Sequence, residues 1–177
     1  MIIDSKKAEE QAVLNLAYKV CAAVRTAPKT RGIDHLETAI LTGEDKEKLS
    51  AEMRRFGQSL GEAGGSIVRD AGNVDKSGAV VIVGAKYGTR GLGERCGFCG
   101  FKDCATCAGA GATCVYTPMD LGIALGSAAA LASDNRVDNR IMFSIGKAAA
   151  LLGLLGEYKL IMGIPLSVSG KSPFFDR

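Results

Sequence analysis

Ala79-Val80-Val81-Ile82-Val83-Gly84-Ala85 is a continuous apolar run, rich in β-branched residues, and it is the stretch that decides the fold. Alternating apolar and polar residues would indicate a strand with one wet face, whereas an unbroken run predicts a strand that is covered on both faces. Turn-forming residues precede the run at Gly64-Gly65 and at Asp70-Ala71-Gly72-Asn73, and both segments are predicted to be turns. The sequence therefore predicts a central strand with other elements packed on each side of it.

Two helices and a second strand are predicted before the central run. Apolar residues recur with a helical period over residues 5–25, and Ala27-Pro28 ends this helix because proline cannot continue one. A short apolar segment at Leu36–Leu41 predicts a strand. The capping pattern Thr42-Gly43-Glu44-Asp45 then opens a second amphipathic helix, which is expected to stop at about Gly61.

Elements of both kinds are also predicted after the central run. Residues 88–116 are glycine-rich, so this segment is expected to be a loop without a helix or strand of any length. Thr117-Pro118-Met119-Asp120 combines an N-cap residue, a proline at the first helical position and an acidic residue, which predicts a buried helix to about Ala132. A further helix over residues 137–155 and a final strand over residues 159–164 complete the prediction.

Composition limits the class of protein. The 177 residues are 47% hydrophobic, without a repeat or linker, so we expect one α+β domain over residues 1–177, with residues 88–116 inserted as a loop between a core strand and a buried helix. The formal charge of +3 is spread along the chain without a basic run, so nucleic acid is not expected as a partner. The amino terminus lacks the features of a signal peptide, and the most apolar stretch, residues 141–156, is shorter than the roughly 20 residues of a membrane span. A cytoplasmic protein without a membrane partner is predicted.

The cysteines are concentrated in one segment. Cys96, Cys99, Cys104, Cys107 and Cys114 are five of the six cysteines of the chain. Cytoplasmic thiols are kept reduced, so such a cluster indicates metal or redox chemistry before disulfides. Cysteines separated by two residues form a turn that directs both sulfurs at one metal, and neighbouring glycines free backbone amides to donate hydrogen bonds to sulfur. The segment is therefore predicted to bind a metal through thiolates.

Three interpretations of these cysteines are open. The first and favoured one is an iron–sulfur cluster, because close spacing in a glycine-rich loop is typical of such clusters. The second is a zinc site, although the two cysteine pairs are much closer together than the ~12 or more residues usual between zinc-binding pairs. The third is a disulfide network, which the odd fifth cysteine and the predicted compartment disfavour.

Cys96, Cys99 and Cys104 are the predicted ligands of a four-iron cluster ([4Fe-4S]), with Cys114 preferred as the fourth ligand. The distance of Cys114 along the chain lets it approach the cluster from the far side. Cys107 is the alternative fourth ligand. The spacing Cys99-x4-Cys104-x2-Cys107 also equals that of plant-type two-iron clusters, so the cluster type stays open. Cys21, which lies on the apolar face of the first helix, is expected to be a buried thiol without a role in the metal site.

The chain resembles a known family over essentially its whole length. The residues that carry this resemblance are Cys96-Gly-Phe-Cys-Gly-Phe-Lys-Asp-Cys, Cys114, Asp120-Leu-Gly-Ile-Ala-Leu-Gly-Ser, Gly163-Ile-Pro-Leu-Ser and Gly170-Lys-Ser-Pro-Phe-Phe-Asp-Arg. They resemble the uncharacterised ferredoxin-domain protein family of bacteria and archaea. The Cys-Gly-x-Cys-Gly-x-x-x-Cys core is also similar to the four-iron domain of membrane electron-transport complexes, whose distal fourth cysteine stands at a different distance.

The order of elements around Ala27-Pro28, the Ala79–Ala85 strand and the glycine-bearing helix resembles the flavin-dependent nitroreductases, although the arginine-rich start of their first helix is missing. That resemblance implies a nitroreductase-like α+β homodimer that holds FMN at its subunit interface. The flavin contacts that it implies are Lys29 and Thr30, after the Ala-Pro turn, and Lys171 in the tail.

The leading functional hypothesis is an iron–sulfur redox protein in which a [4Fe-4S] cluster transfers one electron, with a redox partner protein or a small-molecule acceptor. Phe98 and Phe101 are expected to shield the cluster. If FMN also binds, the protein would be an oxidoreductase. One alternative is a non-catalytic binding module stapled by zinc, and another is a nitroreductase-like flavoenzyme with structural cysteines. His35 is expected to be a hydrogen-bonding loop residue or a proton donor.

Overall fold

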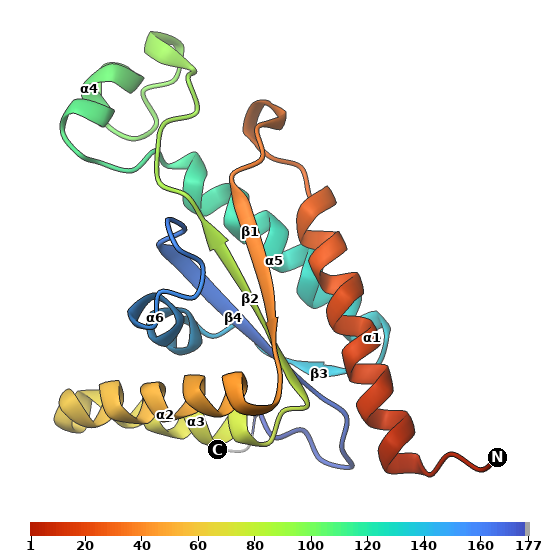
Figure 1. Cartoon of the computed structure of the whole chain (residues 1–177). Coiled ribbons are helices and arrows are strands. Elements are labelled where there is room, and N and C mark those ends of the chain that lie inside the picture. Colours follow the sequence, from red (N-terminus) through yellow and green to blue (C-terminus); the bar gives the residue numbers. More distant parts are fainter. Residues whose placement is uncertain (176–177) are drawn as a thin grey trace.

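The computed structural model describes residues 1–175, and the last two residues of the chain, Asp176 and Arg177, which end the Gly170 motif, lie outside the described residues. Four strands form one antiparallel sheet in the order β1-β2-β4-β3, and helices cover both of its faces (Figure 1). The strands are β1 (Leu36–Leu41), β2 (Ala79–Ala85), β3 (Asp138–Asn139) and β4 (Leu160–Ser167). The α-helices are α1 (Ser5–Thr26), α2 (Gly43–Ser59), α3 (Gly65–Asp75), α4 (Cys104–Gly109), α5 (Tyr116–Asp134) and α6 (Phe143–Leu151). Three short 3-10 helices are η1 (Thr30–Gly32), η2 (Gly61–Gly64) and η3 (Gly93–Arg95).

Strand β2 lies at the centre of the sheet, as the apolar run predicts. It pairs with β1 from Leu36 opposite Ala85 and with β4 from Ala79 opposite Leu166. All seven of its residues are buried. Val81 and Val83 belong to the core on one face of the sheet, whereas Val80 and Ile82 belong to the core on the other face. The prediction of a strand covered on both faces is therefore confirmed.

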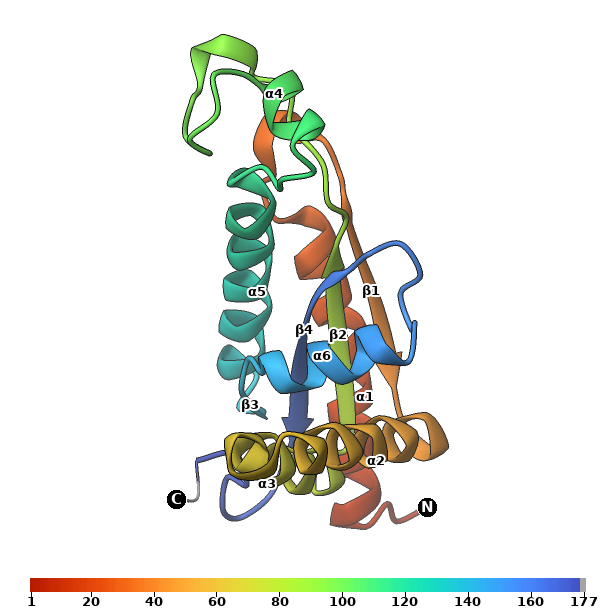
Figure 2. The same ribbon diagram turned by 90° about the vertical axis from the view of Figure 1, so that its left-hand side faces the viewer.

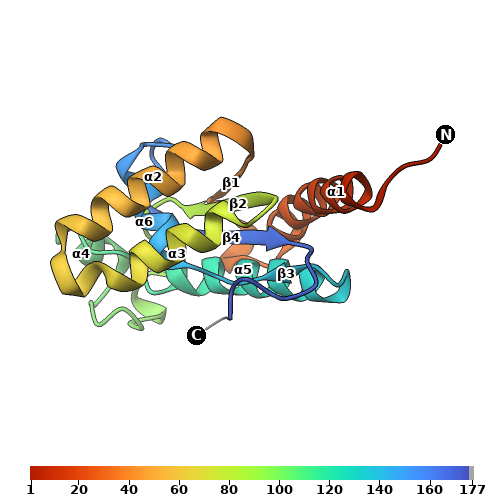
Figure 3. The same ribbon diagram turned by 90° about the horizontal axis from the view of Figure 1, so that it is seen from below.

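The two cores are built from different helices. On one face of the sheet, α1 and α5 run alongside each other and contribute residues such as Val20, Ala124 and Ala128 (Figures 1 and 2). On the other face, α2, α3 and α6 contribute residues such as Met53 and Ile145. Figure 3, a view from below, shows α2 and α3 side by side. An α+β fold with helices on both faces is the result, in agreement with the predicted class.

Helix α6 packs directly on the backbone of β4. A Cβ atom added at Gly146 would lie 1.7 Å from the carbonyl oxygen of Ile161, and one added at Gly163 would lie 2.0 Å from the side chain of Ile145. Only glycine permits so close an approach of helix and strand. These two glycines therefore fix the distance between the helix and the sheet.

The prediction of a turn at Asp70-Ala71-Gly72-Asn73 is wrong, because these residues lie inside α3. Their polar side chains face the interior: Asp70 is buried, and its carboxylate accepts a hydrogen bond of 2.7 Å from the hydroxyl of Ser144 in α6. Tertiary contacts of this kind outweigh local turn propensity. The turn predicted at Gly64-Gly65 is the junction of η2 and α3, where the backbone of Gly64 packs against that of Gly57.

The predicted helix over residues 137–155 is correct only in its middle. Asp138–Asn139 forms the edge strand β3, which pairs with Leu166 and Ser167, and the helix itself is limited to Phe143–Leu151. Backbone hydrogen bonds to β4, including the bridge between Met142 and Gly163, hold the first part of this segment extended. The final strand extends beyond its predicted end at residue 164, to Ser167.

The segment between β2 and α5 projects beyond the sheet and forms one end of the molecule (Figures 1 and 2). It is mostly irregular, but it contains η3 and the six-residue helix α4, so the expectation of a loop without any helix is wrong in this detail. The side chain of Asp103 explains the exception, since it caps α4 by accepting a hydrogen bond from the backbone amide of Thr106. Among residues 1–175, none of the helices is long and apolar enough to cross a membrane.

Candidate metal centre

The cysteine-rich segment is shaped by glycines at its sharpest turn. Gly97 and Gly100 have φ angles of 62° and 80°, which are left-handed values that side chains other than glycine rarely adopt. The amide of Gly100 donates a 3.0 Å hydrogen bond to the carbonyl of Gly97, which closes the turn between Cys96 and Cys99. The turn thus places these two cysteines on the same side of the loop.

Four of the cysteines line one pocket. They are Cys96, Cys99, Cys104 and Cys114, the four predicted ligands, and Cys107 is not among the residues that line it. The remaining walls come from the loop and the start of α5: Arg90, Leu92, Gly93, Gly97, Phe101, Asp103, Val115 and Tyr116. All six cysteines of the chain are free thiols. Within residues 1–175, no three Cys, His, Asp or Glu side chains stand close enough together to hold a metal ion.

Cys104 and Cys107 have different surroundings although both belong to α4. The sulfur of Cys104 accepts a hydrogen bond of 3.3 Å from the backbone amide of Gly93. The thiol of Cys107 is fully buried and instead donates to the carbonyl of Ala112 at 3.6 Å. Burial raises the pKa of Cys107, and the neighbouring sulfur of Cys99 raises it further. The sulfur of Cys104 thus accepts a backbone hydrogen bond, whereas the thiol of Cys107 donates one and has a raised pKa.

Tyr116 forms the wall between the pocket and α5. Burial raises the pKa of its hydroxyl, and the nearby sulfurs of Cys96 and Cys114 act in the same direction. The ring of Phe98 stacks on Tyr116 with centroids 6.2 Å apart and an interplanar angle of 24°. Phe98 is nevertheless 71% exposed, so the expectation that it shields the site is wrong, whereas Phe101 does line the pocket.

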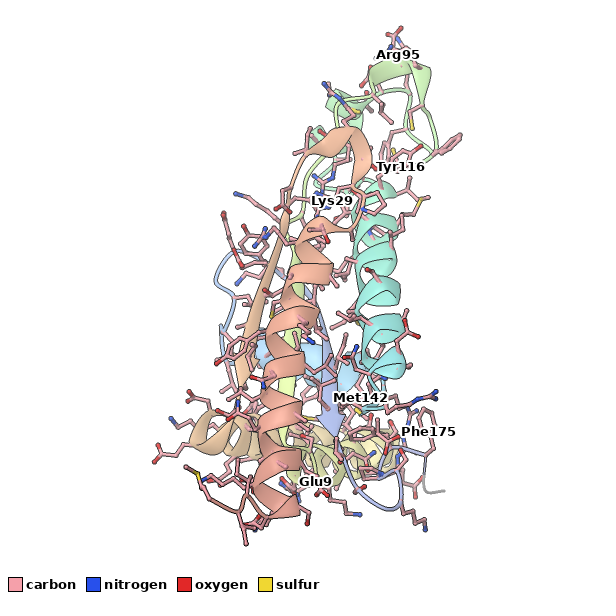
Figure 4. All side chains as sticks on the ribbon, turned by 90° about the vertical axis from the view of Figure 1, so that its right-hand side faces the viewer. Glu9, Lys29, Arg95, Tyr116, Met142 and Phe175 are labelled. Atoms are coloured by element: carbon pink, nitrogen blue, oxygen red, sulfur yellow. The ribbon has the colours of Figure 1, made fainter. Side chains whose placement is uncertain are left out.

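The base of the projecting segment is fastened to the body by arginines. The guanidinium of Arg31, in η1, donates 3.1 Å hydrogen bonds to the carbonyls of Arg90 and Gly91. Arg90 itself is buried and donates to the carbonyl of Lys86 and to the hydroxyl of Thr117. In Figure 4, Tyr116 marks the start of α5 below the segment, and Arg95 marks its outer end.

Thr117 does not cap α5, contrary to the prediction. The helix begins at Tyr116 after Val115, and no side chain accepts a capping hydrogen bond there. The hydroxyl of Thr117 instead donates to the carbonyl of Gly88 at 3.3 Å and accepts from Arg90. Pro118 still lies in the first turn, where backbone amides have no partner within the helix. The capping pattern therefore identified the helix, but its threonine connects the helix to the loop.

A buried polar cluster lies beneath the projecting segment. It contains His35, Arg90, Thr117 and Asp120, each less than a tenth exposed, together with Thr30. The backbone amide and the hydroxyl of Thr30 both donate to one carboxylate oxygen of Asp120, at 3.1 and 2.8 Å. No local sequence pattern indicates a role for Arg90, and the capping pattern accounts for Asp120 only as an acidic residue of a first helical turn. A charged residue in an otherwise apolar helix was the signal that could have identified Asp120.

The three residues that the resemblance implies for flavin are not brought together. The buried ammonium group of Lys29 donates to the carbonyls of Val24, Arg25 and Ala27 at the end of α1. Lys29 lies near the projecting segment (Figure 4), whereas Lys171 lies beside Lys76 and Ser167, next to the end of β4. Cys21 packs against the first core, as expected, but it is half-buried and not fully buried, and burial raises its pKa.

Comparison with solved structures defines the class of fold. A nitroreductase with bound FMN from Desulfitobacterium hafniense DCB-2 matches with a TM-score of 0.60 and 12% identity, over 97% of this chain and 81% of that chain. A BluB-like flavoprotein from Clostridium difficile 630 matches with a TM-score of 0.58 and 14% identity, over 97% and 83%. Nitroreductase A from Vibrio parahaemolyticus matches with a TM-score of 0.56 and 12% identity over 98% of this chain, which spans 62% of that protein. The chain thus has a nitroreductase-like α+β fold, which confirms the predicted fold class.

Comparison of sequences defines the family. An uncharacterized protein of Archaeoglobus fulgidus is 39% identical over 186 aligned positions, which cover 100% of this chain and 98% of that protein. Residues 110–177 match the family described as "uncharacterized protein containing a ferredoxin domain" (DUF2148). The chain belongs to this family, as its cysteine and C-terminal motifs predict. The matched residues include Cys114 but not the four cysteines that precede it.

Proposed function

We propose that this chain is an iron–sulfur redox protein that transfers single electrons through a four-iron cluster held by Cys96, Cys99, Cys104 and Cys114. The observation that carries the proposal is that these four sulfurs, from three separate parts of the segment, line the same pocket. Membership in a family that is described by a ferredoxin domain supports the same class of function.

The residues around the pocket fit an iron–sulfur cluster. Four cysteines are the usual ligand set, and hydrogen bonds to the sulfurs stabilise their negative charge, as the amide of Gly93 does for Cys104. The positive side chain of Arg90 and the ring of Phe101 complete the walls. When bound, such a cluster supplies one-electron transfer, and the protein sets its potential through charge, burial and hydrogen bonds.

Cys114 is a better fourth ligand than Cys107. Cys114 lines the pocket, whereas the thiol of Cys107 donates a hydrogen bond to a backbone carbonyl outside it. A ligand must be deprotonated, and burial opposes the loss of the proton from Cys107. The same argument disfavours the plant-type two-iron spacing, because that arrangement requires Cys107.

A matched pair of variants tests the proposal on protein made and purified without oxygen. The wild type is expected to be brown and to contain about four iron and four acid-labile sulfide atoms per chain. Cys114→Ala is expected to lose most of this iron, whereas Cys107→Ala, a change of the same size in the same segment, is expected to keep it. Wild-type protein without iron or sulfide would refute the proposal, and the reverse behaviour of the two variants would refute the ligand assignment.

Zinc remains the alternative occupant that the same experiment separates. Four thiolates also suit tetrahedral zinc, and the protein would then be a stapled binding module without redox chemistry. Such a protein would be colourless and would contain one zinc and no sulfide. Iron with sulfide would instead support an electron-transfer protein, whose acceptor we expect to be a redox partner protein or a small molecule in the cytoplasm.

A flavin is the second candidate, and the fold likeness to a nitroreductase with bound FMN favours it. If FMN binds as well, the protein would be an oxidoreductase that converts single electrons into two-electron reduction of a small molecule. The internal hydrogen bonds of Lys29 and Thr30 leave these residues little capacity for flavin contacts. A yellow homodimer that keeps its flavin spectrum in Cys96→Ala would instead support a flavoenzyme with structural cysteines.

A further inference from the structure

Three buried polar atoms face one another beneath the cysteine-rich segment without a hydrogen bond. They are Nε2 of His35, Nε of Arg90 and Oδ2 of Asp120, and their side chains are only 3 to 6% exposed. Oδ2 of Asp120 lies 3.4 Å from the histidine nitrogen and 3.8 Å from the arginine nitrogen. Buried polar atoms are nearly always paired, so this arrangement calls for an explanation in terms of function.

The partner missing between His35 and Asp120 is a proton, because of how the imidazole is held. Nδ1 of His35 lies 3.0 Å from the carbonyl oxygen of Ile33. A carbonyl oxygen only accepts, so Nδ1 carries the hydrogen and a neutral imidazole has a bare lone pair at Nε2. That lone pair faces the carboxylate oxygen of Asp120, which is also an acceptor. One proton added at Nε2 would convert two opposed acceptors into a charge-assisted hydrogen bond.

We propose that His35, facing Asp120, takes up one proton when the cluster in the neighbouring pocket gains one electron. This inference rests on the proposed function, because the electron must have a cluster to occupy. Arg90 connects the two sites, since it lines the cysteine pocket and also faces Asp120. His35 and Asp120 are positioning and proton-binding residues in this account, and neither is a ligand of the cluster.

The charges around His35 explain why uptake depends on the electron. Burial lowers the pKa of His35, and Arg90 lowers it further, whereas the hydrogen bond to the Ile33 carbonyl, Asp120 and the more exposed Asp34 raise it. The Nζ atom of Lys29 lies 3.8 Å from Oδ1 of Asp34 and offsets part of the negative charge of Asp34. Burial and Arg90 thus favour the neutral imidazole, and the two carboxylates oppose them. An added electron supplies one more negative charge and favours the protonated form.

Both particles have a source and a destination. A bound cluster would take one electron from an external one-electron donor, and one proton would pass from an acid in the solution to Nε2 of His35, where an N–H bond would form. Reoxidation by an acceptor reverses both transfers. No bond to carbon forms or breaks, and no further oxidant or reductant is required. The net charge around the pocket is therefore the same before and after reduction.

The pH dependence of the cluster's midpoint potential, measured from pH 5 to 8 on the cluster-loaded protein, tests the inference. Coupling of one proton to one electron is expected to lower the potential by up to about 59 mV for each tenfold fall in proton concentration. Without a cluster, burial lowers the pKa of His35 from its ordinary value of about 6.5. The slope is expected between the pKa of His35 beside the oxidised cluster and its higher pKa beside the reduced cluster.

Two variants separate proton binding from a purely structural role. His35→Gln retains an amide that can donate to the Ile33 carbonyl but cannot titrate, so its potential is expected to be independent of pH. Asp120→Asn retains an oxygen for Thr30 but removes the negative charge, so the sloping region is expected to move to lower pH. A wild-type potential that does not change with pH, or an unchanged slope in His35→Gln, overturns the inference.

Proton uptake by the wild type gives a second measurement that does not depend on variants folding. His35 is the single histidine of the chain. Reduction in weakly buffered solution with an indicator dye is expected to remove up to one proton per electron within the sloping range, and none at high pH. No uptake at any pH overturns the inference while the cluster assignment stands. Protein that contains no iron instead overturns the proposed function, and the inference with it.

Discussion

Substitution of Gly146 by alanine is expected to destabilise the protein strongly. The new Cβ would lie 1.7 Å from the carbonyl oxygen of Ile161, about 2 Å short of the roughly 3.5–4.0 Å separation at which such atoms attract. Helix α6 would have to withdraw from β4 and lose part of the packing of Ile145 and Ala149. Overpacking commonly costs about 1–3 kcal/mol, and a clash with backbone is at the upper end or beyond it.

Gly72→Ala is the matched control. Gly72 also lies inside a helix, but a Cβ atom there would meet nothing within 4 Å. Replacement of a helical glycine by alanine at an open site stabilises by about 0.5–1 kcal/mol, so the two variants should shift in opposite directions. For Gly146→Ala, a loss of about 3 kcal/mol corresponds to a fall in Tm of roughly 6–12 °C for a chain of this size.

Thermal and urea unfolding of the two variants, prepared in the same cluster state, measure these changes. A loss of less than about 1 kcal/mol in Gly146→Ala would refute the direct contact between α6 and the backbone of β4, because overpacking on this scale costs more. A loss as large in Gly72→Ala would show that the assay reports general sensitivity to alanine in helices.

Three further changes in unfolding free energy are expected. Lys29→Met removes a buried ammonium group that donates to three carbonyls at the end of α1, and in urea titrations it should cost about 1–3 kcal/mol, whereas the exposed Lys19→Met should cost almost nothing. Ser144→Ala leaves the buried Asp70 without its 2.7 Å donor and should cost a similar amount, in contrast to the exposed Ser66→Ala. Burial lowers the pKa of His35 below its unfolded value of about 6.5, so the unfolded chain binds the proton first as the pH falls, and stability should decrease below about pH 6.5. His35→Gln should flatten this part of a stability profile between pH 5 and 8, and an unchanged profile would contradict the assignment.

The parts of the fold that the sequence predicted correctly are those with strong local patterns. The apolar run of β2 and the helical period of α1 identify elements whose burial follows directly from residue type. The helix α3 was missed because Asp70, Gly72 and Asn73 are typical of turns when taken alone. Their place in a helix depends on partners such as Ser144, which lies 74 residues from Asp70 along the chain.

The cysteines that the motif identified as candidate ligands, including the distant Cys114, line one pocket, and their role as ligands stays a prediction. The motif could not predict the support beneath the pocket, because that support joins side chains from separate elements. Arg90 follows β2, Asp120 lies in α5, and His35 precedes β1, and nothing in their local sequence indicates that they meet. The expectation that Phe98 is shielding failed for a related reason, since ring burial depends on which side of a short turn the residue occupies.

No described residue between positions 86 and 120 belongs to either hydrophobic core. Neither core depends on this segment for its packing. If the proposed cluster binds there, its insertion could be a late event on a folded chain, and its oxidative loss would leave both cores intact. For the same reason, this segment is the part of the molecule that evolution can most easily exchange or remodel while the remainder is preserved.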